Sequence, residues 1–173
     1  MMLAPATDLV TPDGTAERRL ILAELQAVTA GFVSNPHSWM PHLRDNEANR
    51  WFVRLLDTAE YDVWCIGWPS GAGVALHDHG GAIGTCTVVH GQLLETVTDR
   101  ATPARRRWRT LTTGTSVTFG PNHVHGMNNV DDAVALSIHA YAPRLATMTF
   151  FHGDGDELNV SRIADADDSH AAS

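Results

Sequence analysis

The sequence predicts an all-β domain, a small antiparallel barrel of jelly-roll type with helices packed on its outside. Short runs of aliphatic, aromatic and β-branched residues recur through the middle of the chain, and glycines and prolines separate these runs. One helical pattern precedes them. At 173 residues, the chain has the length of a single domain that can bury a substantial core.

The N-terminal part of the chain divides into a lead-in and a helical region. Residues 1–14 contain prolines and a glycine without apolar periodicity, so we expect them to be poorly ordered. A helix is predicted over residues 15–30, and a short second helix over residues 45–51. The first helix would pack its apolar stripe against the barrel. That stripe consists of Ile21, Leu25, Val28 and Phe32.

The strands follow up to residue 152, so the predicted domain spans residues 15–152. An arginine-rich segment, residues 99–109, is interpreted as a solvated loop. From residue 153 the chain becomes acidic and small, and we expect residues 153–173 to form a disordered tail. The strands are predicted over residues 52–56, 61–68, 85–89, 92–98, 108–111, 115–119, 134–141 and 145–151.

Composition excludes several classes of function. The formal net charge is -8 and no basic stripe is present, which argues against nucleic acid as a partner. No stretch is long and apolar enough to predict a membrane span, and no secretory leader is recognisable, so we expect a cytoplasmic protein. We also expect a monomer. Cys65 and Cys86 are expected to be free buried thiols, and neither receives a role.

Histidines provide the first indication of chemistry. His77 and His79 are two residues apart, and in an extended strand such residues project to the same side, where both can bind one ion. A third imidazole has to come from elsewhere in the chain. His123 and His125 form a second His-x-His and compete for that place. Three neutral imidazoles would leave coordination positions open for water or substrate.

The spacings around these histidines resemble the two motifs of the cupin family. Gly71 stands six residues before His77, and Gly91 falls where the first motif closes with glycine. In the second segment Asn129 follows His125 by four residues, which favours His125 over His123 as the third ligand. One departure is clear: the usual glutamate of the first motif is absent, and Gly84 occupies its place.

A third motif narrows the resemblance within the cupins. The run Ser137-Ile138-His139-Ala140-Tyr141, together with three histidines and no carboxylate, closely resembles the thiol dioxygenases typified by cysteine dioxygenase. This resemblance implies Fe(II) as the cofactor. In that family the position of Gly84 is either a cysteine crosslinked to tyrosine or a glycine, so the chain resembles the uncrosslinked bacterial type. The implied metal ligands are His77, His79 and His125.

The same resemblance implies a substrate site and a catalytic group. Arg54 matches an arginine that binds the substrate carboxylate, which favours an amino-acid thiol. The implied substrate wall consists of Phe52, Ile66 and Trp68. Alternation along a strand would point Ser137, His139 and Tyr141 the same way, and the resemblance assigns these three residues to positioning the substrate and O2.

The expected reaction adds both atoms of O2 to the sulfur of a small thiol, and converts L-cysteine to cysteine sulfinic acid. Other thiols could bind the metal ion equally well, namely 3-mercaptopropionate, cysteamine or a larger thiol such as ergothioneine. Two other functions also remain open. A zinc-dependent cupin hydrolase or lyase could begin from the same histidines but would need a general base. A non-catalytic cupin could bind a small molecule without turnover.

Overall fold

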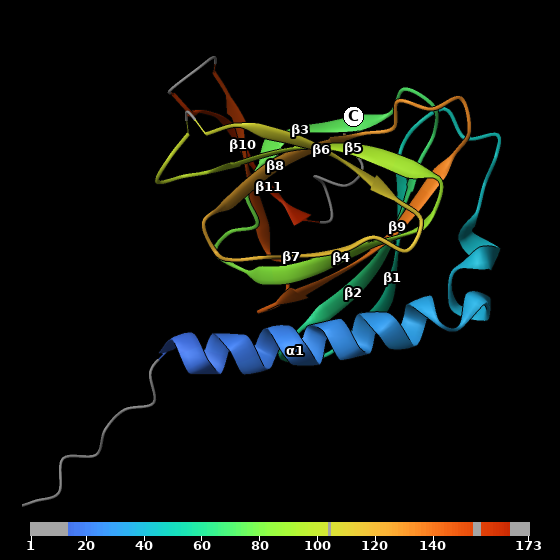
Figure 1. Cartoon of the computed structure of the whole chain (residues 1–173), viewed down its shortest axis with the longest axis horizontal. Helices are drawn as coiled ribbons and strands as arrows, with labels where there is room; N and C mark the ends of the chain where they lie inside the picture. Colours follow the sequence, from blue (N-terminus) through green and yellow to red (C-terminus); the bar gives the residue numbers. More distant parts are fainter. Residues whose placement is uncertain (1–13, 104, 154–156, 167–173) are drawn as a thin grey trace, which may run out of the picture.

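The computed structural model describes residues 14–103, 105–153 and 157–166, with side chains described from residue 21 onward in the first helix. The predicted lead-in before Gly14 and the last part of the predicted tail lie outside these residues. The described chain contains a long helix and two antiparallel sheets that face each other (Figure 1). This arrangement confirms the all-β, jelly-roll prediction, although the strands form two sheets and do not close into one continuous barrel.

The N-terminal helix α1 spans Gly14–Val33, so it covers the predicted range and extends about one turn beyond it. Two short 3-10 helices follow at Pro36–Ser38 and Met40–His42, each with a proline in its first turn. The predicted helix over residues 45–51 is wrong. Those residues form turns and bends before Trp51 enters the first strand, where its indole N–H donates to the carbonyl of His42.

The first sheet has the strand order β1-β2-β9-β4-β7, and the second has the order β11-β10-β3-β8-β5-β6. All strand pairs are antiparallel. The strands of the first sheet are β1 (Trp51–Asp57), β2 (Asp62–Trp68), β9 (Ala135–Ala142), β4 (Ile83–His90) and β7 (Ser116–Phe119). Those of the second are β11 (Asn159–Asp165), β10 (Thr147–His152), β3 (Gly73–His77), β8 (His123–Asn128), β5 (Gln92–Asp99) and β6 (Arg107–Thr112).

The central strands of the first sheet, β2, β9 and β4, are buried on both faces, so apolar residues occur on both of their faces. Alternate residues of β2 and β9 contribute to two separate cores. Trp64 and Tyr141, for example, belong to the core between the sheets, whereas Cys65 and Ile138 belong to the core beneath the helix. The period of two along each strand therefore decides which side chains face the interior between the sheets.

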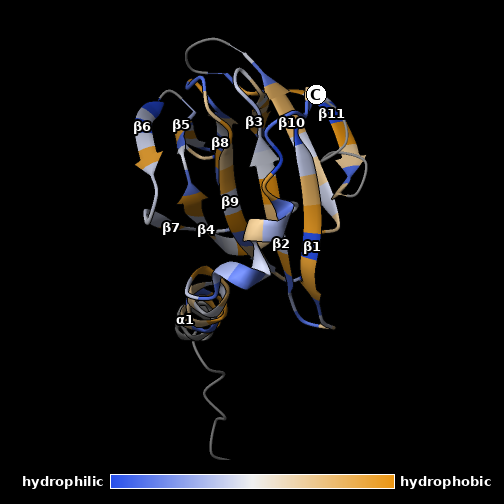
Figure 2. Cartoon of the chain, turned by 90° about the vertical axis from the view of Figure 1, so that its right-hand side faces the viewer, coloured by the Kyte–Doolittle hydropathy of each residue, from blue (hydrophilic) through white to orange (hydrophobic). Residues whose placement is uncertain are grey.

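Helix α1 covers the outer face of the first sheet, where it packs on β4 and β9, and Figure 2 shows it end-on below β4. Leu25 is 1% exposed, and the other predicted stripe residues pack around it on the same core. The predicted packing of the stripe is therefore confirmed. No helix in the described part of the chain is both long and apolar enough to cross a membrane.

The C-terminal region differs from its prediction. Residues 159–165, which we expected to be part of a disordered tail, form β11 and pair with β10 at the edge of the second sheet. β11 is the edge strand of this sheet, and its first five residues are all exposed. The composition of this segment suggested disorder because it does not reveal that β10 supplies the hydrogen bonds of a strand.

A close contact between β1 and β2 generates a stability prediction. Gly67 is paired with Trp51, and a Cβ added at Gly67 would lie inside the Trp51 indole. Gly67→Ala must therefore displace a buried ring, and we expect it to lower the free energy of unfolding by about 1–3 kcal/mol. Chemical denaturation measures this loss.

The matched control is Gly31→Ala, because a Cβ at Gly31 in α1 meets nothing within 4 Å. That substitution should be neutral or stabilising by about 0.5–1 kcal/mol, since alanine favours a helix more than glycine does. Equal unfolding free energies for the two variants would contradict the proposed contact.

Candidate metal centre

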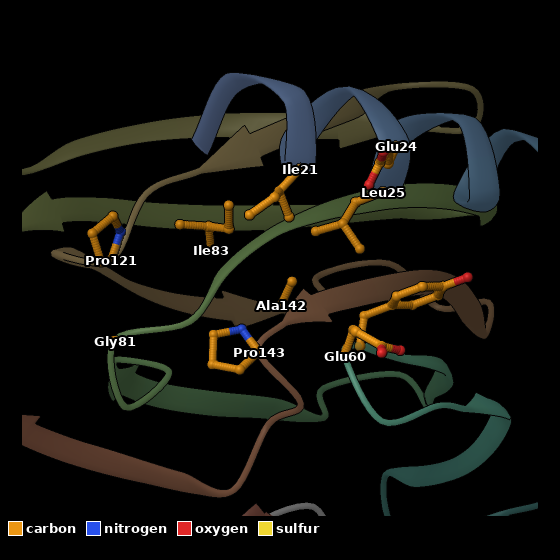
Figure 3. Close-up of a pocket in the computed structure, with 10 residues that line it drawn as sticks. Ile21, Glu24, Leu25, Glu60, Gly81, Ile83, Pro121, Ala142 and Pro143 are labelled. Atoms are coloured by element: carbon orange, nitrogen blue, oxygen red, sulfur yellow. The ribbon is translucent and has the colours of Figure 1, made fainter. Parts of the chain in front are cut away.

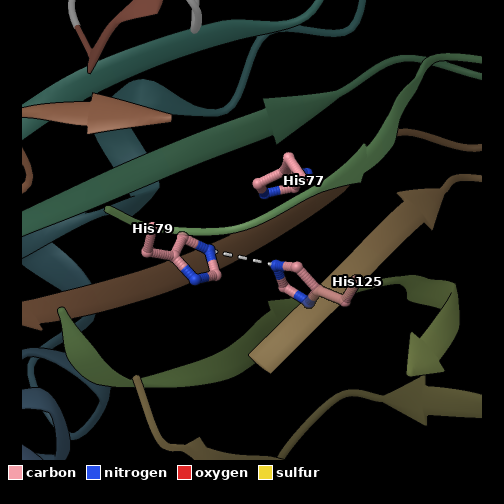
Figure 4. Close-up of side chains that lie close together, drawn as sticks. All are labelled: His77, His79 and His125. Carbon is pink, nitrogen blue, oxygen red and sulfur yellow. Dashed lines mark hydrogen bonds between the residues drawn. The ribbon is translucent and has the colours of Figure 1, made fainter. Parts of the chain in front are cut away.

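Three histidines converge between the two sheets (Figure 4). His77 ends β3, His79 follows in the next loop, and His125 lies in β8 directly opposite His77. Their ring centres are 4.7 to 5.1 Å apart. The Nε2 atoms of His79 and His125 are 3.2 Å apart, a spacing that suits two nitrogens bound to one ion at about 2.1 Å. The sequence placed both His77 and His79 in an extended strand, but the strand ends at His77.

Hydrogen bonds behind two of the rings orient them toward one point. The Nδ1 atom of His77 lies 2.8 Å from the carbonyl oxygen of Ala75, and Nδ1 of His125 lies 2.7 Å from a carboxylate oxygen of Glu95. Because both partners are acceptors, each Nδ1 carries the proton and each Nε2 keeps a lone pair. Burial lowers the pKa of His79 well below its ordinary value. Burial also lowers the pKa of His125, against the opposing effect of Glu95.

These features fit a bound metal ion. All three rings are buried, with no more than 4% exposure, and their ligand atoms lie within 4.8 Å of one another. Uncharged imidazoles are the form that binds iron, zinc, copper and nickel. The structure therefore brings together the three ligands that the sequence predicted.

A second group adjoins the first, formed by Glu95, His123 and His125, whose ligand atoms also lie within 4.8 Å of one another. Its carboxylate is already bonded to Arg109 through a 2.5 Å contact, and His125 is shared with the first group. His123 Nε2 lies 3.7 Å from Glu95, beyond direct hydrogen-bond distance. Although burial opposes ionisation, contacts with His123, His125 and Arg109 hold the pKa of Glu95 well below its usual range.

Asp78 lies between His77 and His79 in the sequence, but its carboxylate binds other partners. Its carboxylate is fully buried, accepts hydrogen bonds from the backbone N–H groups of Gly80 and Thr149, and forms an ion pair with Arg100. It holds the loop that carries His79 against β10. Asp78 is therefore a structural residue of the site.

The predicted serine, histidine and tyrosine form a hydrogen-bonded chain on the inner face of β9. Ser137 Oγ lies 2.8 Å from His139 Nε2, and His139 Nδ1 lies 3.2 Å from the hydroxyl of Tyr141. All three side chains are buried, and the Tyr141 ring centre is 5.1 Å from that of His79. Tyr141, the last member of this hydrogen-bonded series, therefore lies beside the three histidines.

Trp68 extends this hydrogen-bonded series by one residue. Its indole N–H is a donor only, and it lies 2.9 Å from Ser137 Oγ. The Ser137 hydroxyl accepts from Trp68 and keeps its own proton, which it can donate to His139 Nε2; in that arrangement His139 Nδ1 carries the ring proton and donates it to the Tyr141 oxygen. In that arrangement the Tyr141 hydroxyl keeps its own proton as a donor. Burial raises the pKa of Tyr141 well above its ordinary value, which keeps that proton in place.

The remaining predicted substrate residues line the inner face of β1 and β2. Ile66 is 2% exposed and pairs with Phe52 across the two strands. Phe52 is partly buried, 5.5 Å from the Trp64 ring centre. Arg54 lies over Trp64 at 4.2 Å and contacts Asp57 at 3.3 Å, with its side chain 28% exposed.

Sequence reasoning missed a second arginine, Arg50, on the same side of the sheet. It is 5% exposed and its guanidinium carbon lies 5.1 Å from the Trp68 ring centre. Burial lowers the pKa of Arg50 to about 10, and the nearby Tyr141 opposes this shift. The signal was the spacing of two residues: Arg50 lies two residues before Phe52 and four before Arg54, so a strand continued to Arg50 would point all three side chains to the same face.

Glu95 was missed for a similar reason. It lies two residues beyond Leu93, which is fully buried, and therefore occupies an inward position of β5. A lone carboxylate at such a position indicates a buried polar partner. The sequence could not identify that partner as His125, because the pairing of β5 with β8 joins segments that are far apart in the chain.

Gly84 pairs directly with Tyr141 across β4 and β9. A Cβ at this position would crowd the Phe119 ring and the carbonyl oxygen of Ala140. The neighbouring thiol, Cys86, lies 3.5 Å from His139 Nε2 and pairs with His139 further along the same two strands. Burial raises the pKa of the Cys86 thiol above its ordinary range, so it remains protonated. Cys65 faces the other core.

A separate cavity of about 650 Å³ lies between α1 and the outer face of the first sheet (Figure 3). Its walls are mainly apolar, with Ile21 and Leu25 from the helix and Ile83 and Ala142 from the sheet. Glu24 and Glu60 also line it. The cavity shares no lining residue with the histidine cluster. It is therefore separate from the candidate metal site, which lies between the two sheets.

Comparison with known proteins agrees with this geometry. The family model described as cysteine dioxygenase type I matches residues 15–153. No curated protein matches the sequence.

Solved structures share the fold. The protein TT1209 from Thermus thermophilus is 17% identical, with a TM-score of 0.52, and the match covers 61% of this chain and 93% of that protein. A double-stranded β-helix protein from Klebsiella pneumoniae is 17% identical, with a TM-score of 0.50 and coverage of 71% and 93%. An oxalate oxidase in complex with glycolate is 14% identical, with a TM-score of 0.53 and coverage of 62% and 58%. At these identities the likeness concerns the fold alone, which is the cupin fold.

The geometry predicts different roles for the two histidines of β8. His125→Ala removes one of three converging ligands and should weaken Fe(II) binding by at least about 100-fold, whereas His123→Ala should bind Fe(II) nearly as well as the unmodified protein. Anaerobic equilibrium dialysis with Fe(II) measures both affinities. Comparable losses in the two variants would instead place the ion between Glu95, His123 and His125.

Proposed function

Because this chain belongs to the cysteine dioxygenase type I family, we propose that it is a thiol dioxygenase that converts L-cysteine to cysteine sulfinic acid. The overall reaction adds O2 to the thiol, R–SH + O2 → R–SO2H, so both oxygen atoms end on sulfur. The observation that carries this proposal is the convergence of three buried imidazoles beside the Tyr141 ring. The family match makes thiol oxidation the reaction class that this site supports best.

We assign Fe(II) to His77, His79 and His125. Bound there, the ion would supply O2 activation and would favour the thiolate form of the substrate. The protein contributes ligands without charge, because the two adjoining carboxylates are engaged elsewhere: Asp78 with the backbone and Arg100, and Glu95 with His125 and Arg109. The site therefore retains a positive charge that attracts an anionic sulfur.

The chain from Trp68 to Tyr141 orients the substrate in this proposal. Each side chain in it is buried and hydrogen-bonded to the next, so the Tyr141 hydroxyl has a defined position and a proton that it can donate to bound substrate or O2. Phe52 and Ile66 supply the apolar wall on the same inner face. Trp68, expected to be part of that wall, contributes through its hydrogen bond to Ser137.

Two arginines could bind the substrate carboxylate. Arg54 occupies the position that matches the family, and its planar guanidinium could bind a carboxylate in place of Asp57. Arg50 is more deeply buried and interacts with Tyr141, which makes it the second candidate. We assign the carboxylate to Arg54.

We also propose that the enzyme works without a cysteine–tyrosine crosslink. Gly84 stands opposite Tyr141 where such a cysteine would be required, and the crowding by Phe119 supports a glycine at this position. The intact mass of the protein after turnover should equal the mass calculated from its sequence. A loss of two hydrogen atoms localised to Tyr141 would refute this proposal.

The zinc hydrolase and the non-catalytic binding protein are less well supported. A hydrolase needs a general base beside the metal, and both adjoining carboxylates are held by other partners. A binding protein would not need the Tyr141 chain. Turnover and metal analysis separate these functions from the dioxygenase.

The function is tested by oxygen consumption of the Fe(II)-loaded protein across cysteine, 3-mercaptopropionate, cysteamine and ergothioneine. We expect O2 uptake with cysteine, together with a product that has gained two oxygen atoms by mass spectrometry. Oxidation of another thiol in preference would change the substrate but not the reaction. Absence of oxidation of every thiol, despite iron bound at the three histidines, would refute the proposed function.

The arginine assignment predicts a selective change in KM. Arg54→Gln should raise KM for cysteine by about 10- to 100-fold, because a charge-assisted hydrogen bond to carboxylate contributes about 1.5–3 kcal/mol. KM for cysteamine, which has no carboxylate, should change little. Steady-state kinetics on both thiols measure this difference.

Arg144→Gln is the matched control, because Arg144 also pairs with Asp57 but is an exposed residue beyond the end of β9. It should leave both KM values unchanged. If Arg50→Gln raises KM for cysteine selectively and Arg54→Gln does not, the carboxylate binds Arg50.

A further inference from the structure

We propose that Glu95 is a positioning residue for the metal centre, because its carboxylate holds the proton of His125 on Nδ1. Arg109 in turn fixes the orientation of the side chain at position 95. This inference rests on the proposed metal centre and extends it to two residues that the family resemblance did not indicate. It is carried by the linear arrangement of Arg109, Glu95 and His125 across three neighbouring strands, β6, β5 and β8.

The contact between Glu95 and His125 decides which imidazole nitrogen faces the cluster. Glu95 Oε1 lies 2.7 Å from Nδ1 of His125, while Nε2 of the same ring lies 3.2 Å from His79 Nε2. A carboxylate can only accept, so Nδ1 must donate, and Nε2 is left with the lone pair that a metal ion requires. The side chain of Glu95 is 1% exposed, so water cannot readily replace it.

The contact between Glu95 and Arg109 engages the second carboxylate oxygen. Arg109 Nε donates to Glu95 Oε2, and the two residues are directly paired across β5 and β6. With both oxygens bonded, the carboxylate has one orientation. The arginine also compensates the buried negative charge, which leaves Glu95 as a hydrogen-bond acceptor for His125 and disfavours a second cation at this position.

This geometry makes Glu95→Gln an informative substitution, because glutamine has nearly the same shape but one oxygen and one NH2 group. Arg109 can only donate, so it will hold the amide oxygen and turn the NH2 group toward His125. Nδ1 must then accept, which moves the imidazole proton to Nε2, the nitrogen that faces His77 and His79. Metal binding is weakened although the packing is almost unchanged.

The test uses Co(II) as the probe and follows its visible absorption as it binds the metal-free protein, so the readout is independent of turnover. Glu95→Gln should lower Co(II) affinity by about 10- to 100-fold. Adding Arg109→Met to this variant lets the amide rotate and present its oxygen to His125, so the double variant should regain most of the lost affinity. A residue that only fills space would show neither the loss nor the rescue.

Arg107→Met is the matched control for Arg109→Met, because Arg107 is two residues away on the same strand. Its neighbour across β5 and β6 is Val97, which has no carboxylate. It should not rescue Glu95→Gln. The imidazole nitrogen shifts of His125 in the metal-free, unmodified protein provide a measurement that needs no variant, and NMR should show the proton on Nδ1.

Several outcomes would overturn the inference. These are Co(II) affinity of Glu95→Gln equal to that of the unmodified protein, a double variant that binds no better than Glu95→Gln, or a His125 proton on Nε2 in the unmodified protein. Failure of the unmodified protein to bind Co(II) or Fe(II) is a different result, because it would refute the metal centre and the proposed function together.

Discussion

The antiparallel pairing of β3 with β8 is the constraint on which the site depends. It places His77 opposite His125 and joins two segments that are separated by β4, β5, β6 and β7 in the chain. Asn129 secures the end of β8: its side-chain NH2 group donates to the carbonyls of Trp68 and Ala133, and its backbone bonds to Ala72. A slip of one residue in this register would turn His125 away from the interior.

The first sheet carries the second half of the site and has to be rigid for that purpose. Ser137, His139 and Tyr141 face the interior, whereas Leu136, Ile138 and Ala140 pack beneath α1. Because both faces of β9 are buried, the strand has little freedom to move, and the hydrogen-bonded chain that it carries keeps its geometry. The helix thus contributes to the site without touching it.

Buried polar groups in this interior are organised by donors and acceptors of fixed type. Trp68 can only donate and stands at one end of the serine–histidine–tyrosine chain, and Arg109 can only donate and stands behind Glu95 and His125. Glu95, which can only accept, places the proton of His125 on Nδ1, and the proton of Ser137 can be donated to His139 Nε2. In the proposed function, the two arrangements prepare opposite sides of one site: a lone pair for the metal and a hydroxyl proton for the substrate.

The sequence by itself determined the residue types and which residues of each strand share one face. Motif spacing, through the resemblance to the cupins and the thiol dioxygenases, indicated His77, His79 and His125. The period of two along a strand indicated that the triad of β9 shares one face. The sequence also predicted the all-β class, α1 and most strands. Only the tertiary structure decided which inward-facing side chains of different strands come into contact. It paired Glu95 with His125, brought Arg50 over Trp68 and gave β11 a partner in β10, because each of these contacts joins segments whose proximity is set by long-range strand pairing.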